Sequence, residues 1–129
     1  MGNCDLKILE QIHLKVVEAS PDAIIVIDRN GTIIVFNAQA ELMFGYDRSE
    51  VIGQPIQILV PEDQRNIHIT HISKYFEEPH IDDLMPSPTL NGRNRDGFTF
   101  PIQIKIAPII VCSGGVHAMA VVRRVKDRK

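Results

Sequence analysis

The chain has 129 residues, of which 44% are hydrophobic and 23% charged, and its formal net charge is −2. This length suits one domain around one core, and the composition is far from the low hydrophobicity and high charge of disordered chains. The small negative charge excludes the strong positive field that holds proteins on nucleic acid, and no apolar run approaches the roughly 20 residues that span a bilayer.

The two cysteines, Cys4 and Cys112, lie far apart in the sequence. They do not form the dense pattern of a secreted disulfide scaffold, so free thiols in a reducing compartment are expected. The first residues also lack the basic flank and apolar core of a signal peptide. We therefore expect a cytoplasmic protein.

The first predicted element is an amphipathic helix within residues 1–19. Its apolar stripe recurs at spacings of three and four residues and consists of Leu6, Leu9, Ile12 and Val16. Such a stripe is too apolar for a lone helix to leave in water. We expect it either to cover the outer face of a sheet in its own subunit or to form the interface of a homodimer, and both interpretations stay open.

A β-hairpin is predicted next. Residues 23–27 and 32–36 are β-branched runs, and Asn30-Gly31 lies between them. Asn-Gly favours a tight turn because both residues tolerate positive φ, so the two runs should pair as antiparallel strands.

Helices should follow the hairpin. Asn37 is an N-cap residue type before the helix formers of residues 38–44, and Gly45 can end that helix in a left-handed conformation. Two short helical turns are predicted at residues 49–53 and 55–59. A longer helix should begin at Pro61, which suits a first turn, and run to about Phe76.

Residues 77–91 hold three prolines without a sustained period and are predicted to be a loop. Arg95-Asp96-Gly97 marks a second hairpin turn, and residues 98–107 alternate apolar and polar side chains as a strand does. The last strand, residues 116–125, is apolar on both faces and should be central. Because the helices are grouped between strand pairs, the predicted fold class is α+β with an antiparallel sheet.

In this order and spacing the motifs resemble the PAS family over residues 19–125. The matching segments are residues 20–28, 30–33, 36–41, 44–46, 50–53, 95–97 and 100–101. The resemblance implies a five-stranded antiparallel sheet with helices over one face, enclosing a pocket. In some members this pocket holds haem, flavin or a small metabolite, and in others it is packed core. The expected organisation is an N-terminal helix (1–19), a PAS domain (20–125) and the start of a linker (126–129).

His68 is the candidate ligand-binding residue. The segment Val60–His68 resembles the one that carries the haem-ligating histidine in oxygen-sensing PAS domains, which implies His68 as an axial haem ligand. Ile72, Met85 and Ile104 are candidates for the pocket lining. The alternative is that His68 is a hydrogen-bonded structural histidine and that no haem is bound.

Other cofactors fit the sequence less well. No cysteine lies between Cys4 and Cys112, which excludes the thiol adduct of photochemical flavin-binding relatives, and the chain has no tryptophan. Flavin is therefore not expected. Suitable ligand types for a metal site are present at His68, His71, His80, Asp82 and Asp83. Their spacing, however, matches no structural zinc pattern, so a metal site is not expected.

No nucleophile with its base, phosphate loop or dinucleotide fingerprint appears, so the domain itself is not predicted to be an enzyme. The resemblance implies a sensory signal-transduction module, most plainly within a bacterial sensor histidine kinase of a two-component system, with an output domain C-terminal to it. The alternatives are a ligand-free dimerisation platform and a haem-based gas or redox sensor. At the junction to the output, Arg124-Val125-Lys126 stands where the family commonly has Asp-Ile-Thr, so the nature of the coupling contact stays open.

Overall fold

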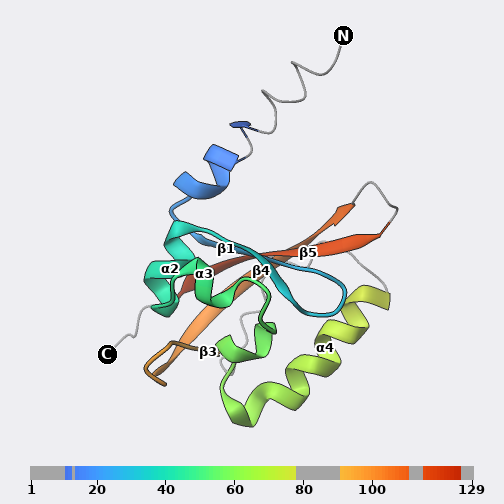
Figure 1. Ribbon diagram of the computed structural model, residues 1–129. Coiled ribbons are helices and arrows are strands. Elements are labelled where there is room, and N and C mark those ends of the chain that lie inside the picture. Colours follow the sequence, from blue (N-terminus) through green and yellow to red (C-terminus); the bar gives the residue numbers. More distant parts are fainter. Residues whose placement is uncertain (1–10, 13, 78–90, 111–114, 126–129) are drawn as a thin grey trace.

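The computed structural model describes residues 11–12, 14–77, 91–110 and 115–125. Within them, strands form one antiparallel sheet in the order β2-β1-β5-β4-β3 (Figure 1). The strands are β1 (Ala23–Ile27), β2 (Ile33–Phe36), β3 (Asn91–Arg93), β4 (Thr99–Ile110) and β5 (Val116–Arg124). The central position of β5, between β1 and β4, agrees with its apolar sequence.

Helices are grouped between β2 and β3 in the chain, as the sequence predicted. They are α2 (Ala38–Phe44), α3 (Arg48–Val51), the 3-10 turns η1 (Ile56–Leu59) and η2 (Glu62–Gln64), and α4 (Arg65–Glu77). Asn37 caps α2 by accepting a hydrogen bond from the backbone N–H of Ala40, and Gly45 ends the helix at φ 76°. The predicted cap and stop residues of α2 are therefore confirmed.

The core lies between the inner face of the sheet and these helices. Alternate residues of β1, β4 and β5 point into it, and α2, α3, η1 and α4 each bury apolar side chains in the same cluster. At its centre the ring of Phe44 lies between those of Phe36 and Phe100, with centroid distances of 6.3 and 5.6 Å. This α+β arrangement is the predicted fold class.

Two local predictions need correction. Phe98 was expected to begin the β4 strand with its side chain in the core, but it is 70% exposed. Its backbone N–H instead donates to Asn94 Oδ1 at 2.9 Å, so Phe98 belongs to the turn before β4. The long helix was expected to begin at Pro61, whereas the 3-10 turn η2 occupies its first residues and α4 begins at Arg65.

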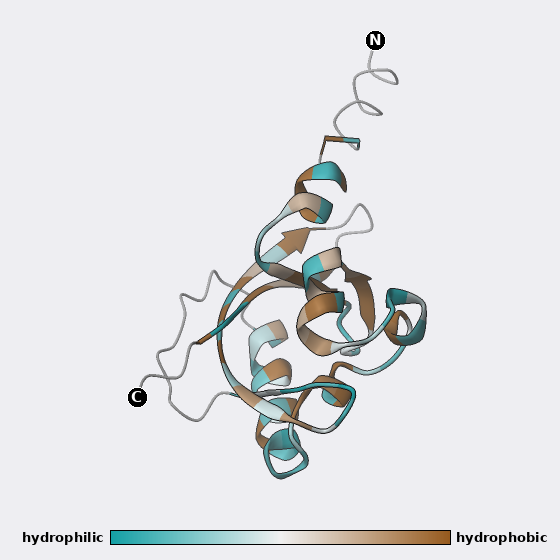
Figure 2. Ribbon diagram, turned by 90° about the vertical axis from the view of Figure 1, so that its left-hand side faces the viewer, coloured by the Kyte–Doolittle hydropathy of each residue, from teal (hydrophilic) through white to brown (hydrophobic). Residues whose placement is uncertain are grey.

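The N-terminal helix, of which residues 11–12 and 14–19 are described, stands away from the sheet (Figure 1). Apolar segments of it lie well clear of the domain body (Figure 2). Ile12, Leu14 and Val16 are 49%, 70% and 62% exposed. Leu6 and Leu9, the other residues of the predicted stripe, lie outside the described residues.

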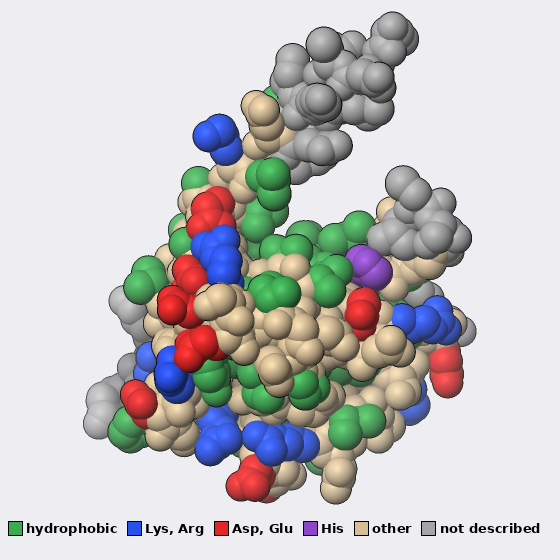
Figure 3. All heavy atoms as spheres, in the orientation of Figure 1, with side chains coloured by type: hydrophobic (Ala, Val, Ile, Leu, Met, Phe, Trp, Pro, Cys, Tyr) green, Lys and Arg blue, Asp and Glu red, His purple; other side chains and the backbone are tan. Residues whose placement is uncertain are grey.

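Acidic and basic side chains alternate along the flank that runs from the N-terminal helix over α2 and α3 (Figure 3). This mixture of signs is consistent with the small net charge. Among the described helices, none is long and apolar enough to cross a membrane.

Candidate functional site

The inward face of α4 carries the candidate ligand-binding residue. Residues three and four apart lie on the same side of a helix, which groups His68 with Ile72, Tyr75 and Phe76. Tyr75 and Phe76 are buried in the core, and Ile72 packs against it. His68 therefore lies two turns before the buried aromatic pair and on the same side of the helix.

The imidazole of His68 is held neutral and has an unused polar atom. Its Nδ1 is buried and makes no hydrogen bond. The pKa of His68 is lowered to about 4, first because burial disfavours the charged ring and second because His71 adds positive charge nearby. At neutral pH the ring is uncharged, the state in which histidine binds metals. The hydrogen-bonded structural role considered for His68 is thus not fulfilled at Nδ1.

A groove of about 460 Å³ opens between the β1–β2 turn and α4. Its volume falls in the range of about 300–1,000 Å³ that is typical of small-ligand sites. The lining combines apolar residues of α4 with polar residues of the turn: Arg29, Asn30, Gly31, Gln57, Ile69, Ile72, Ser73, Phe76 and Glu77. The groove therefore offers apolar contact together with one charge of each sign.

The structure brings together only part of the predicted site. Ile72 lines the groove, while His68 is not among the residues that line it. Ile104 packs against the core from β4, on the inner face of the sheet. Met85 lies outside the described residues, as do His80, Asp82 and Asp83.

Within the described residues, no group of three histidine, cysteine, aspartate or glutamate side chains is placed to hold a metal ion. Haem requires only one axial protein ligand, because the porphyrin supplies the other nitrogen atoms. A neutral imidazole has the donor chemistry that this role needs. His68 therefore fits an axial haem ligand, and no described cluster fits a bare metal ion.

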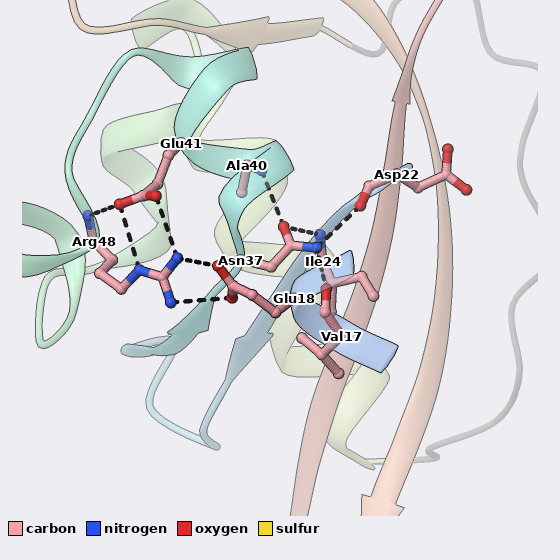
Figure 4. A network of polar contacts seen from close by, with 8 residues as sticks. All are labelled: Val17, Glu18, Asp22, Ile24, Asn37, Ala40, Glu41 and Arg48. Carbon is pink, nitrogen blue, oxygen red and sulfur yellow. Dashed lines mark hydrogen bonds and ion pairs between the residues drawn. The ribbon is translucent and has the colours of Figure 1, made fainter. Parts of the chain in front are cut away.

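The sequence identified Asn37 as a helix cap, but its side chain also joins the start of α2 to the N-terminal helix and to the start of β1 (Figure 4). Its Oδ1 accepts from the backbone N–H groups of Ile24 and Ala40 at 2.9 and 3.0 Å. Its Nδ2 donates to the carbonyls of Val17 and Asp22 at 2.7 and 3.1 Å. Asn37 is 1% exposed, and the two bonds that its Oδ1 accepts are buried, whereas the two that its Nδ2 donates are partly buried.

Arg48 is a second connecting residue, which the sequence analysis missed. Its guanidinium lies between two carboxylates, donating to Glu18 at 3.1 and 2.6 Å and to Glu41 at 3.4 and 3.3 Å (Figure 4). Glu18 is 30 positions earlier in the chain and Glu41 is seven. No local spacing rule pairs residues at those separations, so only the folded chain reveals this contact.

Comparisons of the sequence with a family model and with known proteins point to the same family. Residues 14–125 match the family model of the PAS fold. The sensor protein FixL of Bradyrhizobium diazoefficiens is 40% identical over 99 residues, which cover 74% of this chain and 19% of that protein. The oxygen sensor protein DosP of Escherichia coli is 30% identical over 99 residues, covering 77% of this chain and 12% of that protein. This chain thus spans a small part of the length of both relatives.

Solved structures agree with the sequence matches. The crystal structure of the PAS domain of a protein from Colwellia psychrerythraea superimposes with a TM-score of 0.78 at 25% identity. The superposition covers 94% of this chain and 99% of that domain. The likeness thus extends over nearly the entire fold.

Proposed function

This chain belongs to the PAS family, and from that premise we propose that it senses through a haem held by His68, as the input module of a larger signalling protein. A PAS domain is a sensory module and not a catalytic one, and this one is related in sequence to sensor proteins. The proposal concerns what is sensed and what receives the signal.

The neutral imidazole of His68, whose Nδ1 is buried without a hydrogen-bond partner, carries the haem proposal. An unsatisfied buried polar atom destabilises a fold by about 1–3 kcal/mol, so its presence in a folded domain needs a reason. Haem iron binds histidine through Nε2, so coordination would fix the tautomer of the neutral ring and would account for its burial. The 30% identity to an oxygen sensor protein supports the same interpretation.

A bound haem would supply an iron atom with an open coordination position for a diatomic gas. The chain's own residues would hold and shield it. His68 would act as the axial ligand, and Ile72 on α4 and Ile104 on β4 would offer apolar surface to the macrocycle. Apolar surroundings would also keep the imidazole neutral and exclude water from the iron.

Haem titration of the purified chain tests this proposal. We expect a sharp Soret band that saturates at one haem per chain and is lost in His68→Ala. The matched control is His71→Ala, which removes an exposed histidine one turn further along α4 and should keep the band. Circular dichroism spectra of both variants establish that each is folded. Saturable binding that survives His68→Ala would overturn the assignment.

A second candidate is a ligand-free platform for protein pairing. The aromatic packing of Phe44 against Phe36 and Phe100 favours it, because a filled interior leaves less room for a macrocycle. The titration separates the two functions: a folded protein that gains no Soret band would support the platform.

We propose further that the module works in the cytoplasm as a homodimer and drives an output domain C-terminal to residue 125, as in a sensor histidine kinase. The relation to sensor proteins and to a signal transduction histidine kinase, AtoS of Escherichia coli, supports the output. Exposed apolar residues on the N-terminal helix support pairing, since Ile12 and Val16 lie one turn apart in water. Packing these helices against each other would remove that surface from solvent.

A further inference from the structure

Asp22 joins the entry of the chain into the sheet to its exit. Its carboxylate accepts two hydrogen bonds from the guanidinium of Arg123, at 3.1 and 3.2 Å. Asp22 directly precedes β1 and Arg123 lies at the end of β5, and these two strands pair with Ala23 opposite Val122. Residues 101 positions apart are thus held side by side.

The same residue is tied to the N-terminal helix through the buried amide of Asn37. The Asp22 carbonyl and the Val17 carbonyl, in the last turn of that helix, both accept from Asn37 Nδ2. In Figure 4 the Asp22 carboxylate points away from this amide, which leaves it available to Arg123. The backbone carbonyl of Asp22 is therefore linked through Asn37 to the N-terminal helix, and its side chain is bonded to Arg123 on β5.

Arg48 adds a second tie at the first residue of α3. It forms ion pairs with Glu18 on the N-terminal helix and with Glu41 on α2. Hydrogen bonds from Arg48 lower the pKa of Glu41, which keeps this carboxylate charged. The helix is thereby tied to the domain by two contacts, a partly buried one at Val17 and an exposed one at Glu18.

The exit of the chain is fixed on its other side as well. The guanidinium of Arg124 lies over the ring of Phe100, 4.6 Å from its centroid. The backbone N–H of Val125 donates to the Pro101 carbonyl at 3.0 Å. Arg124 and Val125 belong to the segment that stands where the family commonly has Asp-Ile-Thr. The end of β5 is thus held by side-chain contacts of two consecutive arginines, Arg123 and Arg124, and by the backbone of Val125.

We infer that Glu18, Asp22, Asn37, Arg48 and Arg123 form a latch through which the N-terminal helix and the end of β5 move as one unit. A rearrangement of the helix, for example on pairing, would then reach the C-terminal exit through the latch without passing through the ligand site. The latch goes beyond the proposed haem function and does not depend on it.

Hydrogen–deuterium exchange of the haem-free full chain, measured by mass spectrometry, tests the latch. A substitution at one end of the latch should change amide exchange in the segment at its other end. Arg48→Gln breaks the tie at the helix, and Asp22→Asn breaks the tie at the exit while keeping the backbone carbonyl that Asn37 uses. We expect Arg48→Gln to speed exchange at residues 120–125, and Asp22→Asn to speed it at residues 14–19. The expected change is roughly two- to fivefold, which is the range that exposed ion pairs support.

Arg29→Gln is the matched control, because it removes an exposed arginine from the β1–β2 turn and should leave both segments unchanged. Faster exchange confined to the segment next to each substitution would overturn the latch, and so would unchanged exchange in both variants. Because the measurement uses haem-free protein, its outcome is independent of whether His68 binds haem.

Discussion

Gly92 faces the ring of Phe44 so closely that a Cβ on the glycine would lie 3.0 Å from Phe44 Cε1. The same Cβ would lie 3.3 Å from Cε1 of Phe100. The φ angle of Gly92 is not in the left-handed region, so the need for glycine here is one of space. The short strand β3 closes on the aromatic core through a residue that has no side chain.

We therefore expect Gly92→Ala to lower the free energy of unfolding by about 1–3 kcal/mol, as overpacking of a core does. Urea denaturation followed by circular dichroism measures the change. Adding Phe44→Leu should cost less in the Gly92→Ala background than in the wild type, because the smaller side chain makes room for the methyl group. Strictly additive effects of the two substitutions would contradict the steric explanation.

Asn37→Ala should destabilise the domain by about 2–4 kcal/mol, because it leaves two buried N–H groups and two carbonyls without their side-chain partner. Asn37→Asp is the informative companion. It keeps both acceptor positions but replaces the donating Nδ2 with an oxygen facing the Val17 and Asp22 carbonyls. We expect it to be about as destabilising as alanine in thermal unfolding, and a wild-type melting temperature would show that the donated bonds contribute little.

His68 predicts a pH dependence of stability. Its pKa is about 4 in the folded protein and near 6.5 when unfolded. Between these values the unfolded chain binds more protons, so the free energy of unfolding falls as the pH drops from 6.5 to 4 and this contribution levels off below. At pH 4.5 the loss relative to pH 7 amounts to about 2–3 kcal/mol.

Chemical denaturation of the haem-free protein at pH 7 and pH 4.5 measures this loss. Replacing the imidazole in His68→Leu should remove it, so that the variant loses less stability between the two pH values than the wild type does. His71→Gln should retain most of the loss. If the wild type and His68→Leu respond equally to pH, the buried neutral imidazole is not its source.

The exposed stripe of the N-terminal helix predicts self-association. Replacing Ile12 and Val16 together by glutamate should shift the protein from dimer toward monomer in sedimentation velocity runs, because like charges would face each other across the paired helices. The domain fold should be unaffected, since both side chains are already in water. Ile67→Glu, which charges a 59% exposed residue on α4, should leave the association unchanged. A dimer that tolerates the double substitution would place the interface elsewhere.

The predicted segments with strong local signals are present in the structure. The β-branched run at residues 23–27 is β1 over the same residues, and Asn37 and Gly45 bound α2 as predicted. Hydrophobic periodicity, helix-capping residues and turn residues act over a few positions, so they can be recognised in the sequence itself. The family resemblance extended this reading to the fifth strand.

The alternation of apolar and polar residues failed as a guide at two places. β3 reads Asn-Gly-Arg, which carries no strand alternation, and it lies where Phe44 and Phe100 leave little room for a side chain at Gly92. Phe98 has the spacing of a core residue, yet bonds to Asn94 hold it in a turn. For β3 the packing against distant rings mattered, whereas for Phe98 a local hydrogen bond to the side chain of Asn94 competed with the alternation pattern.

The sequence alone determined the fold class and the family, and it made His68 the candidate ligand-binding residue. Alternation, helix caps and the order of the motifs can all be recognised without knowing which segments meet in space. Only the tertiary structure decided that His68 is neutral with an unused nitrogen, that Ile12 and Val16 face water, and that Asp22 meets Arg123. Burial and long-range charge pairing depend on which segments come together, and that information exists only in the folded chain.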